Sequence, residues 1–113
     1  MSAVILVGCN SSTWIMKSDN VTVDSWTFSA ESAHGIETKD FNLSAANLAA
    51  LHMESTISSG KASLIVIQGS TEFDIDISEG FSGNIDMSDF KPGALKLSLA
   101  FEKAQGVKVV ISW

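Results

Sequence analysis

Four aspartates are spaced so that pairs of them could hold a divalent cation. Asp74 and Asp76 alternate with apolar residues, so on a β-strand both carboxylates point to one face, where a single Ca²⁺ could bridge them. Asp86 and Asp89 form a second pair close to a turn. The alternative is a charged outer face that protects a strand from pairing with another chain. Because no Asp-x-Asp-x-Asp-Gly calcium loop occurs, we predict no metal site. Asp74 and Asp76 are the residues that would bind calcium if such a site existed.

The two histidines, His34 and His52, are the side chains best suited to proton transfer near neutral pH. Counting residues leaves a Ser-His-Asp arrangement open, but the sequence contains no Gly-x-Ser-x-Gly nucleophile elbow. His34 precedes Gly35, a pair typical of an exposed turn. Thirteen carboxylates also allow glycosidase-like acid pairs on paper, without singling one out. We therefore assign no catalytic residue and expect the protein not to be an enzyme.

The single cysteine, Cys9, follows the apolar residues 3–7 and Gly8, and it precedes the polar residues 10–12. The segment Leu6-Val7-Gly8-Cys9 looks like a bacterial lipobox, in which the signal peptide is cut before a cysteine that carries a diacylglyceryl group. A full secretory signal has a basic start and a longer apolar segment than this chain offers. We expect a truncated signal peptide with lipid attachment at Cys9. The alternative is a first strand at residues 3–7, with Cys9 as a small buried apolar residue.

Aromatic residues could offer a stacking surface for sugar rings. The chain has three tryptophans and six phenylalanines, and Trp14 and Trp26 are the candidate ligand-binding residues. Trp14 lies in a polar stretch, whereas Trp113 continues the apolar parity of the preceding strand. The alternative is that each ring belongs to the core. The absence of tyrosine, a favoured contact residue at interfaces, supports the core interpretation.

Length and charge exclude several classes of protein. A chain of 113 residues fits one domain with a core that needs no cross-links, and one cysteine excludes an internal disulfide. Seven lysines, no arginine and thirteen carboxylates give a formal net charge of −6. This composition disfavours a nucleic-acid partner, because phosphate recognition needs a concentrated basic patch. No run approaches the about 20 apolar residues of a membrane-spanning helix, so we expect membrane contact only through a lipid.

Alternation of apolar and polar residues predicts antiparallel strands with one wet face at residues 72–78, 95–102 and 107–113. Residues 104–106 have the length and the glycine of a hairpin loop, so we predict that the strands on either side pair as neighbours.

A second hairpin is predicted at residues 32–35, between β-rich residues 21–29 and 36–43. The mixed parity of residues 21–29 indicates either two covered faces or a bulge near Asp24 and Ser25.

Residues 64–67 are apolar on both parities, which predicts a central strand covered on both sides. A turn at residues 58–60 links this strand to a preceding strand at residues 53–57. Ser44 could cap a brief helix that is rich in alanine.

These segments predict an all-β fold, an antiparallel two-sheet β-sandwich of jelly-roll-like type with seven to eight strands. Residues 21–113 would form the sandwich. Residues 10–20 would be a tether or an N-terminal strand, and residues 1–9 the truncated signal peptide with its lipobox or a first strand.

The chain also resembles small cell-envelope lipoproteins of Gram-positive, Clostridium-like bacteria. The residues that carry the resemblance are the box at residues 6–9, Ser59-Gly60-Lys61 before an apolar strand, residues 85–93 leading into Leu95-Lys96-Leu97, and the terminal Trp113. The resemblance implies a β-sandwich of unknown function, similar in outline to carbohydrate-binding domains. It supplies no catalytic residues.

Together these features lead us to expect a non-enzymatic cell-envelope lipoprotein module, anchored through Cys9 on the extracellular face of the membrane. It would bind a glycan, a peptide or a partner protein, without a cofactor and without nucleic acid. The alternatives are a small hydrolase acting on cell-wall or surface polymers and a soluble intracellular β-sandwich.

Overall fold

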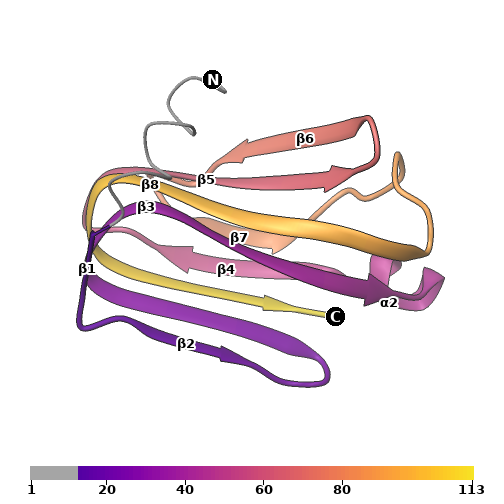
Figure 1. Ribbon diagram of the computed structural model, residues 1–113, viewed down its shortest axis with the longest axis horizontal. Helices are drawn as coiled ribbons and strands as arrows, with labels where there is room; N and C mark the ends of the chain where they lie inside the picture. The colour runs from indigo at the N-terminus through magenta and orange to yellow at the C-terminus, as the bar shows by residue number, and fades with distance from the viewer. Residues whose placement is uncertain (1–12) are drawn as a thin grey trace.

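Two long strands, β3 (Ser25–Leu43) and β8 (Gly93–Ser112), run antiparallel beside each other over nearly their whole length. In the computed structural model, which describes residues 13–113, they pair from Ser25 opposite Ser112 to Leu43 opposite Gly93. Both strands curve round at one end of the molecule, so that their two halves lie in two facing layers (Figure 1). Every other strand of the described part pairs with this bent pair or with a strand beside it.

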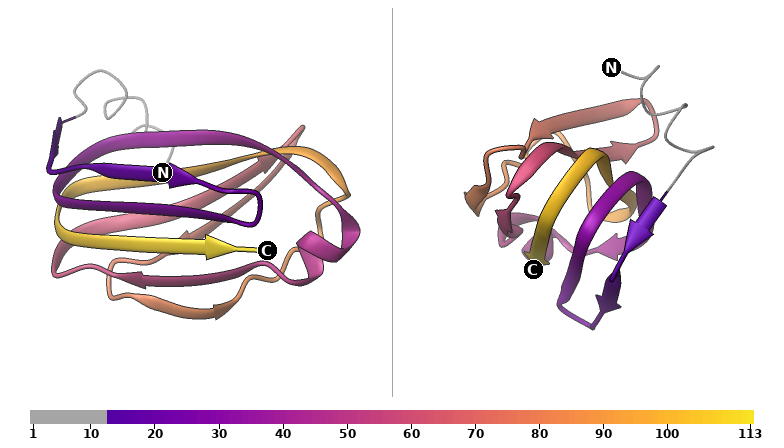
Figure 2. Two further views of the ribbon diagram at one scale, coloured as in Figure 1. Left: turned by 90° about the horizontal axis from the view of Figure 1, so that it is seen from below. Right: turned by 90° about the vertical axis from the view of Figure 1, so that its left-hand side faces the viewer.

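Each layer adds shorter strands to the bent pair (Figure 2). The first layer contains the first half of β3 and the second half of β8, flanked by β2 (Ser18–Val21), β4 (His52–Thr56) and β7 (Phe81–Asn84). The second layer contains the other two halves, with β5 (Ser59–Gln68) and β6 (Thr71–Asp76) beyond β8.

A short strand, β1 (Thr13–Ile15), pairs with β3 at the bend, where Ile15 faces Ser32. A short helix, α2 (Ala45–Ala49), follows β3 at the opposite end of the molecule (Figure 1). The described residues thus form eight antiparallel strands, which confirms the predicted all-β fold. Hydrogen bonds through β3 and β8 join the two layers into one continuous sheet.

The two predicted hairpin loops are bends within continuous strands. Ala33 pairs with Ala104, and the register of β3 against β8 shifts between Ala33 and Gly35. Positive φ angles at Gly35 (128°), Lys103 (50°) and Gly106 (58°) accompany the change of direction of both strands. The predicted pairing within residues 95–113 and the predicted hairpin at residues 32–35 are therefore wrong, because each half pairs with the other long strand. A glycine that breaks the alternation of apolar and polar residues can mark either a bulge within one strand or a turn between two strands.

Other local features follow the sequence more closely. Ser44 Oγ accepts the Asn47 amide at 3.1 Å and Asn47 Oδ1 accepts the Ser44 amide at 3.0 Å, so the predicted cap of α2 is confirmed as a reciprocal capping box. The mixed parity of residues 21–29 has a third cause. Residues 22–24 form a turn between β2 and β3, closed by the Thr22 amide donating to the Ser25 carbonyl at 2.8 Å.

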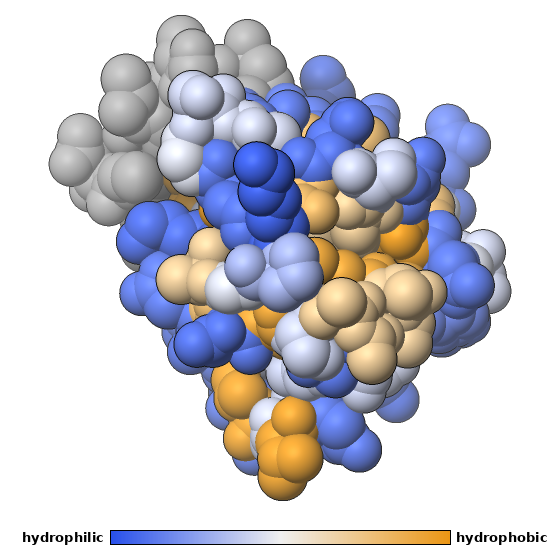
Figure 3. Space-filling view, turned by 90° about the vertical axis from the view of Figure 1, so that its right-hand side faces the viewer, coloured by the Kyte–Doolittle hydropathy of each residue, from blue (hydrophilic) through white to orange (hydrophobic). Residues whose placement is uncertain are grey.

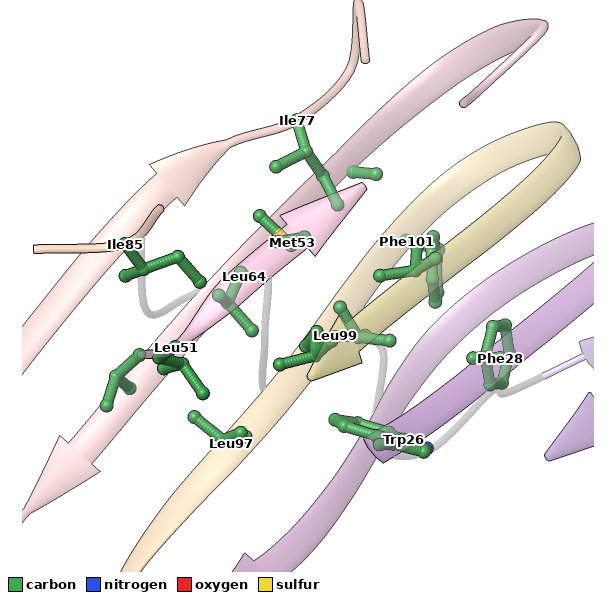
Figure 4. Close-up of a cluster of buried hydrophobic side chains, with 14 of the residues drawn as sticks. Trp26, Phe28, Leu51, Met53, Leu64, Ile77, Ile85, Leu97, Leu99 and Phe101 are labelled. Carbon is green, nitrogen blue, oxygen red and sulfur yellow. The ribbon is translucent and has the colours of Figure 1, made fainter. Parts of the chain in front are cut away.

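The core fills the space between the layers with side chains from β3, β4, β5 and β8 (Figure 4). Trp26 and Phe28 from β3 and Leu97 and Leu99 from β8 belong to this core, and all four are buried. Residues 64–66 of β5 are buried on both parities, which confirms the predicted central strand covered on both sides. Burying such side chains contributes about 1.5–3 kcal/mol each, so the facing layers supply the main driving force of folding.

Ion pairs bridge the side of the molecule where β2 lies across from the second half of β3. Lys39 Nζ lies 2.8 Å from Asp19 Oδ2, Lys17 Nζ lies 2.7 Å from Glu37 Oε1, and Trp26 Nε1 donates to Asp19 Oδ1 at 2.7 Å. Burial raises the pKa of Asp19, but the hydrogen bonds from Lys39 and Trp26 outweigh it and hold this pKa below its ordinary value. The hydrogen bond to Asp19 raises the pKa of Lys39 in return. These paired charges cover the edge of the core between the layers.

Replacing Asp19 with asparagine should make the protein less dependent on pH. A lowered folded-state pKa contributes stability that is present above the unfolded-state value of about 3.9 and is lost as the pH falls through the folded-state value. Asp19→Asn keeps an acceptor for Trp26 but loses the charge, so we expect a loss of roughly 1 kcal/mol in the free energy of unfolding at pH 7. Urea unfolding from pH 7 to pH 3 should show this loss shrinking below about pH 4. A loss as large at pH 3 as at pH 7 would contradict the assignment, and Asp40→Asn, in an exposed pair with Lys96, is the control.

Alanine at Gly60 should destabilise the protein much more than alanine at Gly69. Both glycines have positive φ, so either substitution costs about 1–2 kcal/mol of backbone strain. At Gly60 an added Cβ would also lie 2.2 Å from the carbonyl oxygen of Lys103 and 2.5 Å from the Cα of Ala104, where β8 bends. At Gly69 it would meet no atom within 4 Å. We expect Gly60→Ala to cost about 3 kcal/mol or more in urea unfolding, and equal losses at the two sites would refute the close approach at the bend.

Candidate functional site

An apolar groove lies between α2 and the loop of residues 85–92, at the end of the molecule away from the bend. Figure 3 shows this end, where small parts of apolar residues are visible between hydrophilic ones, and the large apolar side chains of the groove are only 4–7% exposed. The groove holds about 430 Å³, within the range of small ligand sites. Its lining residues are Ala45, Leu48, Ala49, Ile85, Asp86, Met87, Ser88, Phe90 and Pro92.

The walls of the groove are set by local structure. Ala45 and Ala49 are one helical turn apart on the same face of α2, and their small side chains leave the space beside the helix open. On the opposite wall, the Phe90 amide donates to the Met87 carbonyl at 3.0 Å. Gln68 holds the end of the loop from outside, because its amide group bonds both the N–H and the C=O of Lys91, at 2.9 and 2.8 Å. The groove is therefore formed before any ligand binds.

One carboxylate lies on the rim of this apolar space. Asp86 Oδ1 accepts the backbone amide of Ser88 at 3.0 Å, and this bond, with the Ser88 side chain, holds the pKa of Asp86 below its ordinary value. Asp86 is therefore ionised at neutral pH, beside a floor of Leu48, Met87 and Phe90. Such a site suits an apolar group that carries a neighbouring positive charge.

The candidate ligand-binding residues of the sequence lie elsewhere. Cys9 is outside the described residues. Trp26 is 1% exposed in the core, so its ring is not accessible to a ligand. Trp14 packs edge-on against Phe28 and Phe101, with ring centroids 5.6 and 6.1 Å apart. The structure places both tryptophans in packing roles, away from the groove.

The two predicted aspartate pairs lie in different parts of the molecule. Asp74 and Asp76 point to one exposed face of β6, as their spacing predicts, but Asp76 Oδ1 accepts the Ser78 amide at 2.9 Å and hydrogen bonds from Ser78 lower its pKa. Of the second pair, Asp86 lines the groove. Within residues 13–113, no group of three or more histidine, cysteine, aspartate or glutamate side chains is placed to hold a metal ion.

Neither histidine forms a Ser-His-acid relay. His34 lies at the bend, where its Nδ1 accepts the Lys103 amide at 3.2 Å. His52 belongs to a polar group on β4 and β7, the His52 cluster, made of His52, Glu54, Ser82 and Asn84. Ser82 Oγ donates to Glu54 Oε2 at 2.9 Å, and His52 bonds the same oxygen at 2.6 Å. These bonds lower the pKa of Glu54, which makes its carboxylate a weaker base. Because the Ser82 hydroxyl donates to this carboxylate and not to a histidine nitrogen, the arrangement does not activate Ser82 as a nucleophile.

Sequence reasoning missed both the groove and the His52 cluster. The groove joins residues 44–49 and 85–92, whose proximity depends on where the long strands end. The cluster had a readable signal, because His52 and Glu54 are two residues apart on a predicted strand and so share a face. The partner strand β7 could not be identified from the sequence.

In the part of the chain that the structure describes, no helix is both long and apolar enough to cross a membrane. No family model matches the chain, no curated protein matches it significantly, and neither does any solved structure.

Proposed function

We propose that this protein is a non-enzymatic binding module of the cell envelope, anchored through Cys9 to the extracellular face of the membrane. Its ligand is a short peptide segment of a partner protein, and its binding site is the groove between α2 and residues 85–92. The observation that carries the proposal is the preformed apolar floor of this groove with one fixed carboxylate on its rim.

A peptide fits this groove better than a glycan. Sugar rings are held by exposed aromatic faces, and the two candidate tryptophans are packed in or against the core. Phe90, which lines the groove, is only 7% exposed. A leucine or methionine side chain would fill the apolar floor, and a lysine or arginine next to it would reach Asp86. The formal net charge of −6 favours the approach of such a basic segment.

The size of the site predicts a weak complex. One buried apolar side chain contributes about 1.5–3 kcal/mol, and an exposed ion pair adds at most about 1 kcal/mol. Their sum is at most about 4 kcal/mol, which corresponds to a dissociation constant of about 1 mM at best. A lipid anchor gives such an interaction biological use, because two proteins held on the same membrane meet at a high effective concentration.

NMR titration with short synthetic peptides should show binding by those with an apolar residue next to lysine or arginine. Ala49→Trp fills the groove from an exposed helix position and should weaken the binding of such a peptide at least tenfold in the same titration. Ala46→Trp, on the same helix outside the groove, is the control. Asp86→Asn keeps the bond to the Ser88 amide but removes the charge, so it should lower the affinity, whereas Asp89→Asn should not. Peptides that bind Ala49→Trp as tightly as the wild type would refute the site.

Anchoring is tested separately, in cells that express the protein from its own gene with the upstream sequence. The mature protein should begin at Cys9, carry the mass of acyl chains and sediment with membranes. Cys9→Ala should abolish all three properties. A chain of unmodified mass in the soluble fraction would contradict the anchor, but it would leave the groove experiment unaffected.

A further inference from the structure

The His52 cluster places four polar side chains in a two-by-two array on the outer face of β4 and β7. His52 lies opposite Asn84 and Glu54 lies opposite Ser82 in the strand register. His52 Nδ1 is 2.9 Å from Asn84 Oδ1, His52 Nε2 is 2.6 Å from Glu54 Oε2, and Ser82 Oγ is 2.9 Å from the same carboxylate oxygen. The His52 and Glu54 side chains are 36% and 55% exposed, so ions in solution can reach them.

These contacts orient His52 as metal-binding histidines are oriented. A histidine that binds a metal through one ring nitrogen usually donates the N–H of the other nitrogen to an oxygen, which fixes the ring. Asn84 Oδ1 is in place to accept from Nδ1, and this leaves Nε2 directed at the Glu54 carboxylate. Ser82 orients the carboxylate in the same way. Two adjacent donor atoms are thus held by two further side chains.

We propose that His52 Nε2 and the Glu54 carboxylate form a two-ligand site for a divalent first-row transition ion, Zn²⁺ or Cu²⁺, with Asn84 and Ser82 as positioning residues. The ion takes the place of the proton that Nε2 donates to Glu54, and this proton is released to solvent. Water molecules complete the coordination.

The geometry needs only a small adjustment. Zinc bonds of about 2.0–2.2 Å to nitrogen and oxygen in tetrahedral geometry place two neighbouring ligand atoms roughly 3.4 Å apart, compared with 2.6 Å for the present hydrogen bond. Rotation of two exposed side chains supplies this difference. A nitrogen and oxygen donor set favours Cu²⁺ and Zn²⁺ over Ca²⁺ and Mg²⁺, which prefer oxygen ligands alone. With two protein ligands the ion is held reversibly, and its remaining positions are open to a donor from another molecule.

Calorimetric titration with ZnCl₂ tests the proposal. All proteins carry Cys9→Ala, so that the thiol cannot bind the ion. We expect one site per chain, at least tenfold weaker in His52→Ala and in Glu54→Gln and several-fold weaker in Asn84→Ala. His34→Asn, which changes the other histidine, should bind as the parent does. CaCl₂ should give no heat of binding.

Glu54→Gln changes one exposed atom, so it keeps the test valid if His52→Ala unfolds, and circular dichroism checks the fold of each variant. NMR should show the His52 ring signals shifting or broadening with Zn²⁺ while those of His34 stay in place. Absence of binding, binding that survives both His52→Ala and Glu54→Gln, or binding lost in His34→Asn would each overturn the proposal.

Discussion

The pairing of β3 with β8 is the constraint on which the rest of the structure depends. Their register places core residues opposite each other in both layers, and slipping it by one residue would turn each side chain to the wrong face. At the bend, the residues that point into the core shift between even-numbered and odd-numbered positions, so the core residues of both layers still face each other. Along β3 the buried residues are even-numbered up to Ala30 and odd-numbered from Ala33 onward. Along β8 the buried apolar residues are odd-numbered from Leu95 to Phe101, and after Ala104 they are odd-numbered again from Val107. The irregular residues therefore keep the apolar face of each strand on the inside of the curve.

The same change of parity explains which parts of the fold the sequence could predict. Short-range signals were sufficient for the cap of α2 at Ser44, the central strand at residues 64–67 and the alternating strands, because each depends on neighbours in the chain. The hairpins at residues 32–35 and 104–106 failed because a break in alternation with a glycine precedes either a reversal or a bend. Distinguishing the two requires the pairing partner, and β3 and β8 are separated by the 49 residues 44–92. The ion pair between Asp19 and Lys39 likewise could not be predicted, because the sequence does not show that β2 lies across from the second half of β3.

The groove depends on where the long strands end together. Leu43 pairs with Gly93, so the segments that follow β3 and precede β8 must meet at the same end of the molecule. The small residues of α2 and the hydrogen-bonded loop of residues 85–92 do not fill the space between these two segments completely. Leu48, Ile85, Met87 and Phe90 are nevertheless only 4–7% exposed there, so the groove opens onto the outer edges of buried side chains. The groove therefore offers an apolar floor with the Asp86 carboxylate on its rim.

The groove and the His52 cluster are not independent parts of the surface. The strands β4 and β7 carry the cluster, and each continues directly into one wall of the groove, since Leu51 precedes His52 and Ile85 follows Asn84. The Ile85 amide donates to the Leu51 carbonyl at 2.9 Å, which ties the two walls together one residue away from the His52 and Asn84 pair. If a molecule in the groove displaced residues 85–92, this bond would be strained, and an ion bound at the proposed His52 site would resist that displacement. By linkage, any such preference acts equally in both directions, so each site would report on the occupancy of the other.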